Sequence, residues 1–337
     1  MTSYAKRLMI PLTVAPLALL ANTMALPQQP ATYEPPARVT TSQAGTFAEH
    51  LEAARASAGT EWLGVVDHMC TRGSVVTGSA DDPLIEPVRI FDNVYAIGRT
   101  STVVYVIATN EGLMLIDSGY ADQVDSVLLP GMAQLGLEPQ DIRYVVVLHG
   151  HADHYGGSAH LQQRFGARVV ASEADWALME VTDPDSGRPT PPVRDVVAIE
   201  GEPLRLGDGM VTPFLVPGHT PGAISVVFPV RDAEDTHTAA VFGGTALVVP
   251  LLGDAMPQYL ESIDRFAEIA TEMGVNVLLQ NHPLFDGMHE KLERLKVRGP
   301  GDPHPFVLDA LDSYGRFMTT LAYCSRAQVA AASGSDG

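Results

Sequence analysis

Apolar residues recur along the chain in short runs that are separated by turn-forming residues. Runs rich in β-branched residues over 88–97 and 102–109 predict two strands. The turn at 110–112 leads into a further apolar stretch over 113–117, which predicts a hairpin. Apart from Arg143, the run over 142–148 is apolar, as expected of a strand that is buried on both faces.

Strand and helix patterns continue to the C-terminus. We predict strands over 167–171, 193–199, 210–216, 224–230, 238–242 and 275–279. We predict helices over 47–58, 123–135, 158–165, 173–181, 259–273, 290–297 and most of 305–327. A charged loop is predicted over 231–237. Strand-rich stretches in each half, followed by helices, suggest two packed sheets with helices outside. Periodicity alone does not decide between this and other arrangements.

The first residues have the pattern of an export signal. A basic pair at 6–7 precedes an uncharged apolar run over 8–21, and Thr23 and Ala25 are small residues at the spacing of a cleavage site. We therefore predict a cleavable signal over 1–25 and a periplasmic or secreted protein with no membrane attachment after cleavage. A retained N-terminal anchor is the alternative, because signals and anchors overlap in length.

Composition limits the partners of the chain. With 46% hydrophobic residues in 337, the chain can fill a sizeable core. The 40 acidic and 21 basic residues give a formal net charge of -19. Such a surface repels phosphate backbones, so we expect a small-molecule substrate and no nucleic acid. The simpler interpretation of the acidity is solubility, and the oligomeric state is not determined by the sequence.

Two cysteines, Cys70 and Cys324, are present. In an exported protein an even number of cysteines suggests a disulfide, which would tie the N-terminal extension to the last helix. Two separately buried thiols are the alternative, because pairing cannot be deduced from sequence.

The strongest chemical signal is a histidine-rich segment directly after the buried strand. It contains His149, His151, Asp153 and His154 within six residues. Imidazole nitrogens and carboxylate oxygens are good zinc ligands. Residues two apart on an extended segment point the same way, so His149 and His151 can bind one ion. The chain then turns, and Asp153 and His154 can face a second ion.

Two further histidines lie in similar surroundings. His219 lies in a turn with proline and glycine on both sides, and His282 follows an apolar strand and precedes a proline. Each of them alone is more often an ordinary loop histidine. Together with the segment at 149–154, they supply the ligands that a two-metal site still needs.

These motifs, together with the Leu-Ile-Asp-Ser-Gly segment at 115–119, resemble the metallo-β-lactamase superfamily over residues 85 to about 290, and subclass B3 within it. The resemblance implies an α+β fold, an αββα sandwich with the metals at one edge of two sheets. It implies two zinc ions, one held by His149, His151 and His219 and the other by Asp153, His154 and His282. Asp117 would orient the histidine loop. The implied organisation is a signal (1–25), an N-terminal extension (26–84), a catalytic domain (85–300), and a C-terminal helix and tail on the same domain (301–337).

One position departs from many hydrolases of this superfamily. Glyoxalase II and bacterial lactonases carry an aspartate that bridges the metals after the strand that follows the histidine turn, whereas this chain has Thr245 there. A hydroxyl leaves Asp153 as the one anionic ligand, which resembles the B3 pattern. Thr245 either hydrogen-bonds a substrate carboxylate or is simply a strand-end residue.

The resemblance implies a zinc-dependent hydrolase in which a metal-bridging hydroxide attacks a carbonyl and Asp153 orients the nucleophile. A B3-like β-lactamase that opens the β-lactam amide is the first interpretation. A lactonase or other ester hydrolase of the same fold is the second, and a non-catalytic periplasmic metal-binding protein is the third. Fold does not by itself determine function, so the substrate is left open.

Overall fold

The computed structural model describes residues 45–71, 82–181, 187–246, 255–310 and 312–333. The predicted signal over 1–25 lies outside these residues, as do parts of the predicted N-terminal extension and C-terminal tail. The division of the chain at residues 84 and 300 stays a prediction. Among the described helices, none has the length and hydrophobicity needed to cross a bilayer.

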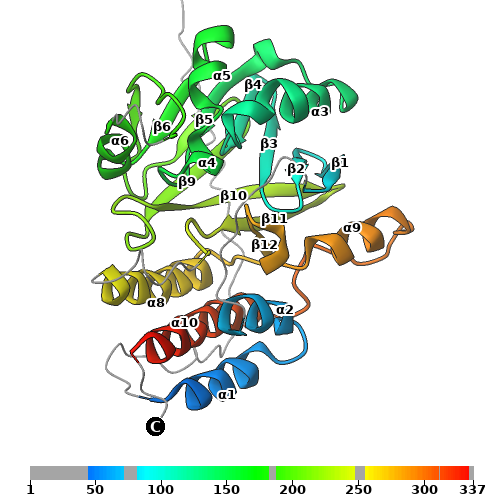
Figure 1. The fold of residues 1–337 in the computed structure, drawn as a ribbon. Helices are drawn as coiled ribbons and strands as arrows, with labels where there is room; N and C mark the ends of the chain where they lie inside the picture. Colours follow the sequence, from blue (N-terminus) through cyan, green and yellow to red (C-terminus); the bar gives the residue numbers. More distant parts are fainter. Residues whose placement is uncertain (1–44, 72–81, 182–186, 247–254, 311, 334–337) are drawn as a thin grey trace, which may run out of the picture. The chain divides into compact units, whose positions relative to one another are not determined.

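Two sheets form the centre of the described chain (Figure 1). The first has the order β1-β2-β3-β4-β5-β6-β7, antiparallel as far as β4 and parallel from there on. Its strands are β1 Leu84–Phe91, β2 Val94–Arg99, β3 Val103–Thr109, β4 Gly112–Ile116, β5 Ile142–Val146, β6 Arg168–Ala171 and β7 Val196–Val197. The predicted hairpin is confirmed, because β3 pairs with β4 across a two-residue turn with Thr109 opposite Gly112.

The second sheet has the order β12-β11-β10-β9-β8. Its strands are β8 Leu204–Leu206, β9 Gly209–Leu215, β10 Ile224–Asp232, β11 Asp235–Val241 and β12 Val277–Leu279. Only β12 and β11 run parallel; the other pairs are antiparallel. Side chains of both sheets meet in one buried cluster, which contains Tyr105 and Ile116 from the first sheet and Val226 and Phe228 from the second. The predicted sandwich of two sheets is therefore confirmed.

The first sheet is buried on both faces. Along β3, Val103 and Tyr105 lie in the cluster between the sheets, whereas Val104 and Val106 lie in a second cluster on the outer face. The outer cluster is covered by η3 (Val124–Leu128), α3 (Leu129–Gln134), α5 (Ser158–Phe165) and α6 (Glu173–Glu180). This two-sided burial explains why the sequences of β3 and β4 are nearly all apolar rather than alternating.

Helices cover the outer face of the second sheet too. α8 (Met256–Glu272), α10 (Ser313–Ala332), α1 (Phe47–Ala58), α2 (Leu63–Val65) and the π-helix η1 (Val66–Thr71) share a third apolar cluster with residues of β10, β11 and β12. The predicted bounds of α1 are confirmed, and a capping box between Thr46 and Glu49 begins this helix. The Cys70–Cys324 disulfide joins η1 to α10, so the paired interpretation of the cysteines is the one that the structure supports.

Several sequence predictions differ from the structure. The strand predicted over 193–199 is only the two-residue β7. The charged loop predicted over 231–237 is wrong, because β10 and β11 continue as a hairpin with Asp232 opposite Asp235 and a positive φ at Ala233. Charged residues are tolerated there because the hairpin end is solvent-exposed. The C-terminal helix begins at Ser313 instead of near 305, since Val307 pairs with Val277 beside β12. The helix predicted over 123–135 is a succession of 3-10, π and α segments.

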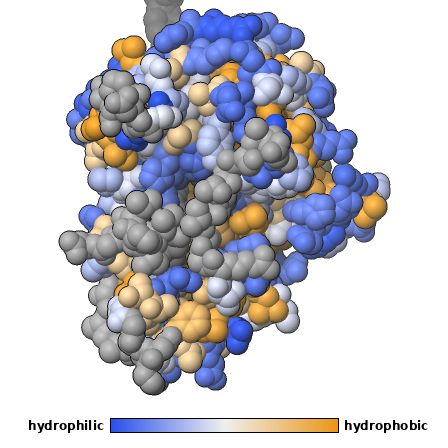
Figure 2. Space-filling view, in the orientation of Figure 1, coloured by the Kyte–Doolittle hydropathy of each residue, from blue (hydrophilic) through white to orange (hydrophobic). Residues whose placement is uncertain are grey.

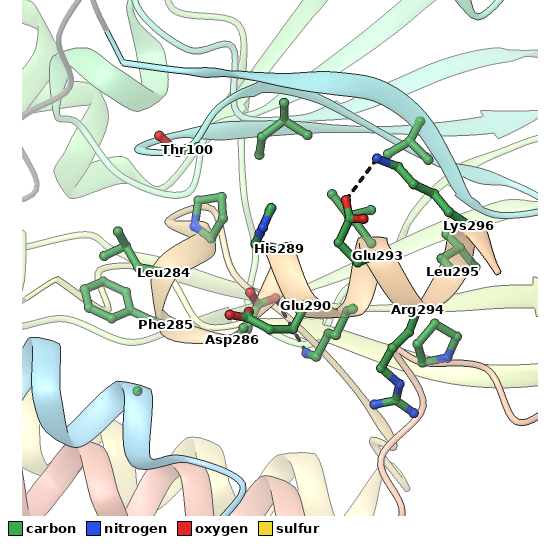
Figure 3. A pocket seen from close by; sticks show the side chains of 18 of the residues that line it. Thr100, Leu284, Phe285, Asp286, His289, Glu290, Glu293, Arg294, Leu295 and Lys296 are labelled. Atoms are coloured by element: carbon green, nitrogen blue, oxygen red, sulfur yellow. Dashed lines mark hydrogen bonds and ion pairs between the residues drawn. The ribbon is translucent and has the colours of Figure 1, made fainter. Parts of the chain in front are cut away.

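A groove with a volume of about 970 Å³ runs between β1, α2 and the segment formed by η6 (Pro283–Phe285) and α9 (Met288–Lys296) (Figure 3). Mixed charges of α9 line it, and hydrophilic residues predominate over α9 on the face shown in Figure 2. At its base Asp286 is buried, neither carboxylate oxygen has a hydrogen-bond partner, and Lys291 Nζ lies 3.9 Å away. None of the histidines of the 149–154 segment lines this groove.

The buried Asp286 predicts a measurable pH effect on stability. Burial raises the pKa of Asp286 to about 6, against an ordinary value near 4, although Lys291 opposes the rise. The folded state therefore holds this proton to higher pH than the unfolded chain. Its stabilising contribution is complete below about pH 4 and is lost as the pH rises through 6, a change of about 3 kcal/mol.

The variant Asp286→Asn stays neutral and should lack this dependence. In urea unfolding of the chelator-treated proteins, the difference in unfolding free energy between wild type and variant should shift in favour of the variant between pH 4.5 and pH 7. A difference that is constant across this range would contradict the assignment.

Candidate metal centre

Segments far apart in sequence meet at one edge of the two sheets. Residues 149–154 follow β5 and run into the short helix α4 (Ala152–Tyr155), His219 lies in the turn between β9 and β10, and His282 follows β12. The two sheets are tied together here, because Ile224 N donates to the carbonyl of Leu148 at 2.8 Å. The six predicted ligands therefore converge, as two groups of three.

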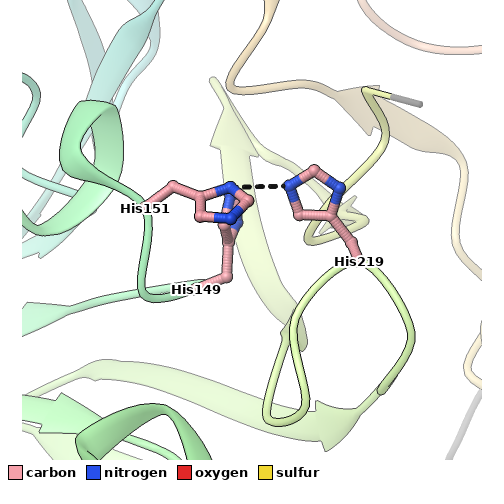
Figure 4. Close-up of side chains that lie close together, drawn as sticks. All are labelled: His149, His151 and His219. Carbon is pink, nitrogen blue, oxygen red and sulfur yellow. Dashed lines mark hydrogen bonds between the residues drawn. The ribbon is translucent and has the colours of Figure 1, made fainter. Parts of the chain in front are cut away.

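The first triad consists of His149, His151 and His219 (Figure 4). Their ring centroids lie 4.5–4.9 Å apart, and His219 Nε2 is 3.0 Å from His151 Nδ1. Both ring nitrogens of the buried His149 lack a hydrogen-bond partner. A buried polar atom without a partner is costly, so this cluster of lone pairs fits a bound cation.

The second triad consists of Asp153, His154 and His282. Asp153 Oδ2 lies 3.1 Å from His154 Nε2 and 3.7 Å from His282 Nε2. Within each triad, one ligand atom from every residue lies within 4.8 Å of the others. Imidazole and carboxylate donors at these separations fit a dinuclear metal site, for which zinc is the typical ion.

Hydrogen bonds on the far side of the rings orient the second triad. His154 Nδ1 lies 2.7 Å from Asp117 Oδ2, and His282 Nδ1 lies 2.8 Å from the carbonyl oxygen of Ser101. Because the Nδ1 atoms are engaged, the Nε2 atoms of both rings face the site. Metal-binding histidines commonly have such partners, which select the tautomer.

Asp117 connects the two triads. Its Oδ1 accepts a hydrogen bond from Leu148 N at 2.8 Å, directly before His149, while its Oδ2 faces His154 and Asn281 Nδ2. The structure thus places Asp117 at the histidine loop as predicted, and adds the contact with His154, which the prediction did not include. The backbone of Asp117 has φ +62°, a conformation that non-glycine residues rarely adopt.

The electrostatics of the first triad favour metal binding. Burial lowers the pKa of His149 and His219 well below the usual range, and neighbouring imidazoles lower it further. Burial likewise lowers the pKa of His151 to about 4. These rings are neutral at neutral pH, which is the form that coordinates metals. Burial disfavours the charged forms of Asp153 and His154, yet their mutual attraction wins, so the pKa of Asp153 is lowered and that of His154 is raised to about 10.

Thr245 does not face a substrate. Its side chain is fully buried, and its hydroxyl lies 3.0 Å from the carbonyl oxygen of Phe242 and also contacts the side-chain oxygen of Gln280. The suggestion that Thr245 hydrogen-bonds a substrate carboxylate is therefore corrected in favour of a strand-end packing role. The hydroxyl is already engaged within the protein, so it has no donor left for a substrate.

Sequence reasoning missed Ser101 and Asn281 as neighbours of the ligands. Ser101 contributes only its backbone carbonyl, so its residue type carries no signal. Asn281 directly precedes His282 and donates to Asp117, a contact that depends on the approach of β12 to β4. In the sequence, only its position next to His282 indicated that Asn281 lies near the metal centre.

A sequence profile described as the metallo-β-lactamase superfamily matches residues 97–233, which include Asp117 and five of the six residues of the two triads. Over this region the chain is similar to the metallo-β-lactamase superfamily, whose fold it shares. Its fold and its two triads are consistent with the metal-dependent hydrolases of this superfamily.

Solved structures agree with this assignment and point to subclass B3. A subclass B3 metallo-β-lactamase of Bradyrhizobium japonicum is 28% identical, with a TM-score of 0.65, over 75% of this chain and 97% of that one. A metallo-β-lactamase of Cronobacter sakazakii is 27% identical, with a TM-score of 0.63, over 74% of this chain and 96% of that one. Nearly the whole of each of these proteins therefore has a counterpart in the present chain.

Curated relatives match a smaller part of the chain. A hydroxyacylglutathione hydrolase of Acidiphilium cryptum is 29% identical over 136 residues, which is 39% of this chain and 49% of that protein. An exodeoxyribonuclease of Bacillus anthracis is 32% identical over 88 residues, 26% of this chain and 32% of that protein. The chain thus spans at most about half the length of these two relatives.

The position of Asp117 predicts a loss of metal affinity in Asp117→Asn. An amide cannot accept hydrogen bonds from both Leu148 N and His154 Nδ1, since one of its two ends carries only donors. We expect zinc affinity to fall by about 10–100-fold, the usual cost of losing a partner of a metal ligand. Competition with a chromogenic chelator measures this. An unchanged affinity would show that Asp117 does not orient the ligands.

Proposed function

We propose that this chain is a zinc-dependent hydrolase that opens the amide of β-lactams, in the manner of subclass B3 enzymes. The observation that carries the proposal is the composition of the two triads: five imidazoles and Asp153 as the single carboxylate. Thr245 stands where other members of the superfamily have a bridging aspartate, and its hydroxyl is turned to Gln280. The similarity to the B3 enzyme of Bradyrhizobium japonicum over nearly its whole length supports the same interpretation.

In the proposal, each triad binds one of two zinc ions. His149, His151 and His219 would hold one zinc ion, and Asp153, His154 and His282 the other. When bound, two such ions supply Lewis acidity and lower the pKa of water toward 7. Because Asp153 is the one anionic group of the triads, little of the positive charge is neutralised, and an anionic substrate is attracted.

Asp153 has a second role in the proposal. One oxygen, Oδ2, lies 3.1 Å from His154 Nε2 and 3.7 Å from His282 Nε2. With both ions bound, the carboxylate would orient the attacking water and pass its proton on to the leaving nitrogen of the amide. No nucleophilic side chain is required, and the sequence contains no Gly-Xaa-Ser-Xaa-Gly segment that would present a serine.

We also propose that the protein acts in the periplasm or outside the cell. The Cys70–Cys324 disulfide supports this, because disulfides persist mainly in oxidising compartments. β-Lactams are encountered in the same compartment. The N-terminal pattern of an export signal over 1–25 points the same way.

A thioester or ester hydrolase is the second candidate, favoured by the similarity to hydroxyacylglutathione hydrolases over 136 residues. The threonine at position 245 counts against it. Similarity to an exodeoxyribonuclease covers only 88 residues, and the net charge of -19 opposes binding of nucleic acid.

One assay series separates these candidates. The zinc-loaded mature protein is offered a chromogenic cephalosporin, a carbapenem, an acyl-homoserine lactone, a hydroxyacylglutathione thioester and single-stranded DNA, each with and without a chelator. Chelator-sensitive turnover of the β-lactams is the expected result. Turnover of the lactone, the thioester or DNA without any β-lactam turnover would overturn the proposed substrate. Binding of two zinc ions with no turnover at all would indicate the non-catalytic alternative.

A further inference from the structure

Another buried carboxylate, that of Asp175 in the first turn of α6, lies behind the first triad. The residue is 1% exposed, and its two oxygens accept three hydrogen bonds. Oδ2 accepts from Gly150 N at 2.8 Å and from Thr220 Oγ1 at 2.6 Å, and Oδ1 accepts from Gly222 N at 2.8 Å. None of these donors belongs to α6. All three hydrogen bonds of the carboxylate therefore join α6 to other segments of the chain.

The three donors come from the two segments that carry the first triad. Gly150 separates His149 from His151, and Thr220 directly follows His219. One side chain therefore bonds to both halves of the triad. The corresponding carboxylate for the second triad is Asp117, which contacts His154. Asp117 also accepts a hydrogen bond from Leu148 N beside the first triad, whereas the hydrogen bonds of Asp175 go only to the two segments of the first triad.

The surroundings of Asp175 leave little room for movement. A Cβ atom at Gly222 would overlap Ser172 Oγ and would lie 2.6 Å from Asp175 N, so only glycine allows this turn to approach α6 so closely. On the other side, the carbonyl oxygen of Gly150 accepts a hydrogen bond from Arg188 at 2.9 Å. Both the backbone N–H and the backbone carbonyl of Gly150 are therefore engaged in hydrogen bonds.

Coordination demands this accuracy. Zinc binds imidazole nitrogen at about 2.0–2.1 Å, so two loops must be aligned to a few tenths of an ångström. His151 Nδ1 and His219 Nε2, which lie on different loops, are already 3.0 Å apart. Their own turns contain glycine and lack the rigidity of a helix or strand. A carboxylate that joins the loops reduces the cost of ordering them when a metal binds.

We propose that Asp175 is a positioning residue that sets the metal affinity of the first triad, a role that rests on the metal site of the proposed function. Asp175 touches neither the metal position nor a substrate, and it acts through Gly150, Thr220 and Gly222. Its loss lowers the affinity at the first triad and leaves the affinity at the second triad nearly unchanged.

The test is Asp175→Asn in the full mature protein, with zinc as the probe and stepwise affinities measured by chelator competition. The asparagine amide keeps only one acceptor oxygen, and its NH2 group would face a hydrogen-bond donor in place of the second oxygen. One of the two affinities should fall by about 10–100-fold, as is usual for a partner of a ligand-bearing segment. Glu173→Gln is the matched control, because it lies in the same turn of α6 but is exposed and pairs with Arg194. Its affinities should equal those of the wild type.

Double variants assign the weakened site. His219→Ala removes the first triad and His282→Ala the second. Added to His219→Ala, Asp175→Asn should cause no further loss at the remaining site; added to His282→Ala, it should cause the full loss. A general structural role would lower both affinities together. A ratio of the two affinities equal to that of the wild type would therefore overturn the proposal.

Two measures keep the test decisive. Where Asp175→Asn does not fold, the variant Thr220→Val replaces it, because it removes one of the three hydrogen bonds with little change of shape. We expect a smaller loss of zinc affinity at the same site. An unchanged zinc affinity in a folded Thr220→Val protein would count against the proposal. The measurement uses no substrate. Absent β-lactam turnover would thus overturn the proposed function alone, whereas an unaltered ratio of affinities would overturn the role of Asp175 alone.

Discussion

Replacing Asp153 with alanine is expected to reduce the rate of hydrolysis by more than about 100-fold. Loss of a residue that only hydrogen-bonds to a metal ligand costs less, about 10–100-fold. The variant loses the single carboxylate of the two triads, whose Oδ2 lies 3.1 Å from His154 Nε2 and 3.7 Å from His282 Nε2. Ion binding at the second triad and the acceptor for the proton of water are both removed. The turnover number should therefore fall, and not only the affinity for the substrate.

The fold should survive this change. Asp153 lies in the short helix α4 at the edge of the sheets, outside the three apolar clusters. Zinc content and circular dichroism must be measured on the same preparation as activity. Asp122→Ala is a suitable control, because Asp122 is an exposed residue of the 3-10 helix η2 (Ala121–Gln123) and does not belong to either triad. Full activity in a folded Asp153→Ala protein of verified zinc content would exclude the assigned mechanism.

Removing the Cys70–Cys324 disulfide is expected to cost about 2–5 kcal/mol of unfolding free energy. The bond joins η1 to α10 across 254 residues of sequence, so it closes a very long loop in the unfolded chain. Constraining that loop lowers the entropy of the unfolded state, which stabilises the fold. Both cysteines are fully buried in the cluster formed by α1, α8 and α10, so their replacement also removes packed volume.

Urea unfolding of the double variant Cys70→Ala, Cys324→Ala measures this loss. Wild type treated with a reductant is the matched comparison, because it loses the bond but keeps both sulfur atoms. The bond lies on the outer face of the second sheet, whereas the triads lie at the edge of the sandwich. The two metal affinities of the folded variant should therefore match those of the wild type. Equal unfolding midpoints for oxidised and reduced protein would show that the bond does not stabilise the fold.

The sequence by itself determined the elements that depend on local pattern. The apolar run at 142–148 is β5 with two further buried residues, because both faces of the first sheet are covered. The helix at 47–58 begins at a capping box, a signal contained within four residues. His149, His151, Asp153 and His154 were recognisable because so many metal-binding side chains directly after an apolar strand have few structural explanations. His219 and His282 alone carried no such signal, and the resemblance to the metallo-β-lactamase superfamily assigned them.

Only the tertiary structure decided the contacts between segments. Asp175 resembles any acidic residue of a first helical turn, and its role appears only when two loops more than 60 residues apart meet α6. The inward turn of Thr245 depends on Gln280, 35 residues away. The start of α10 at Ser313 depends on the pairing of Val307 with β12. Local propensity carries no information about such partners, because their free energy is gained only when distant residues pack together.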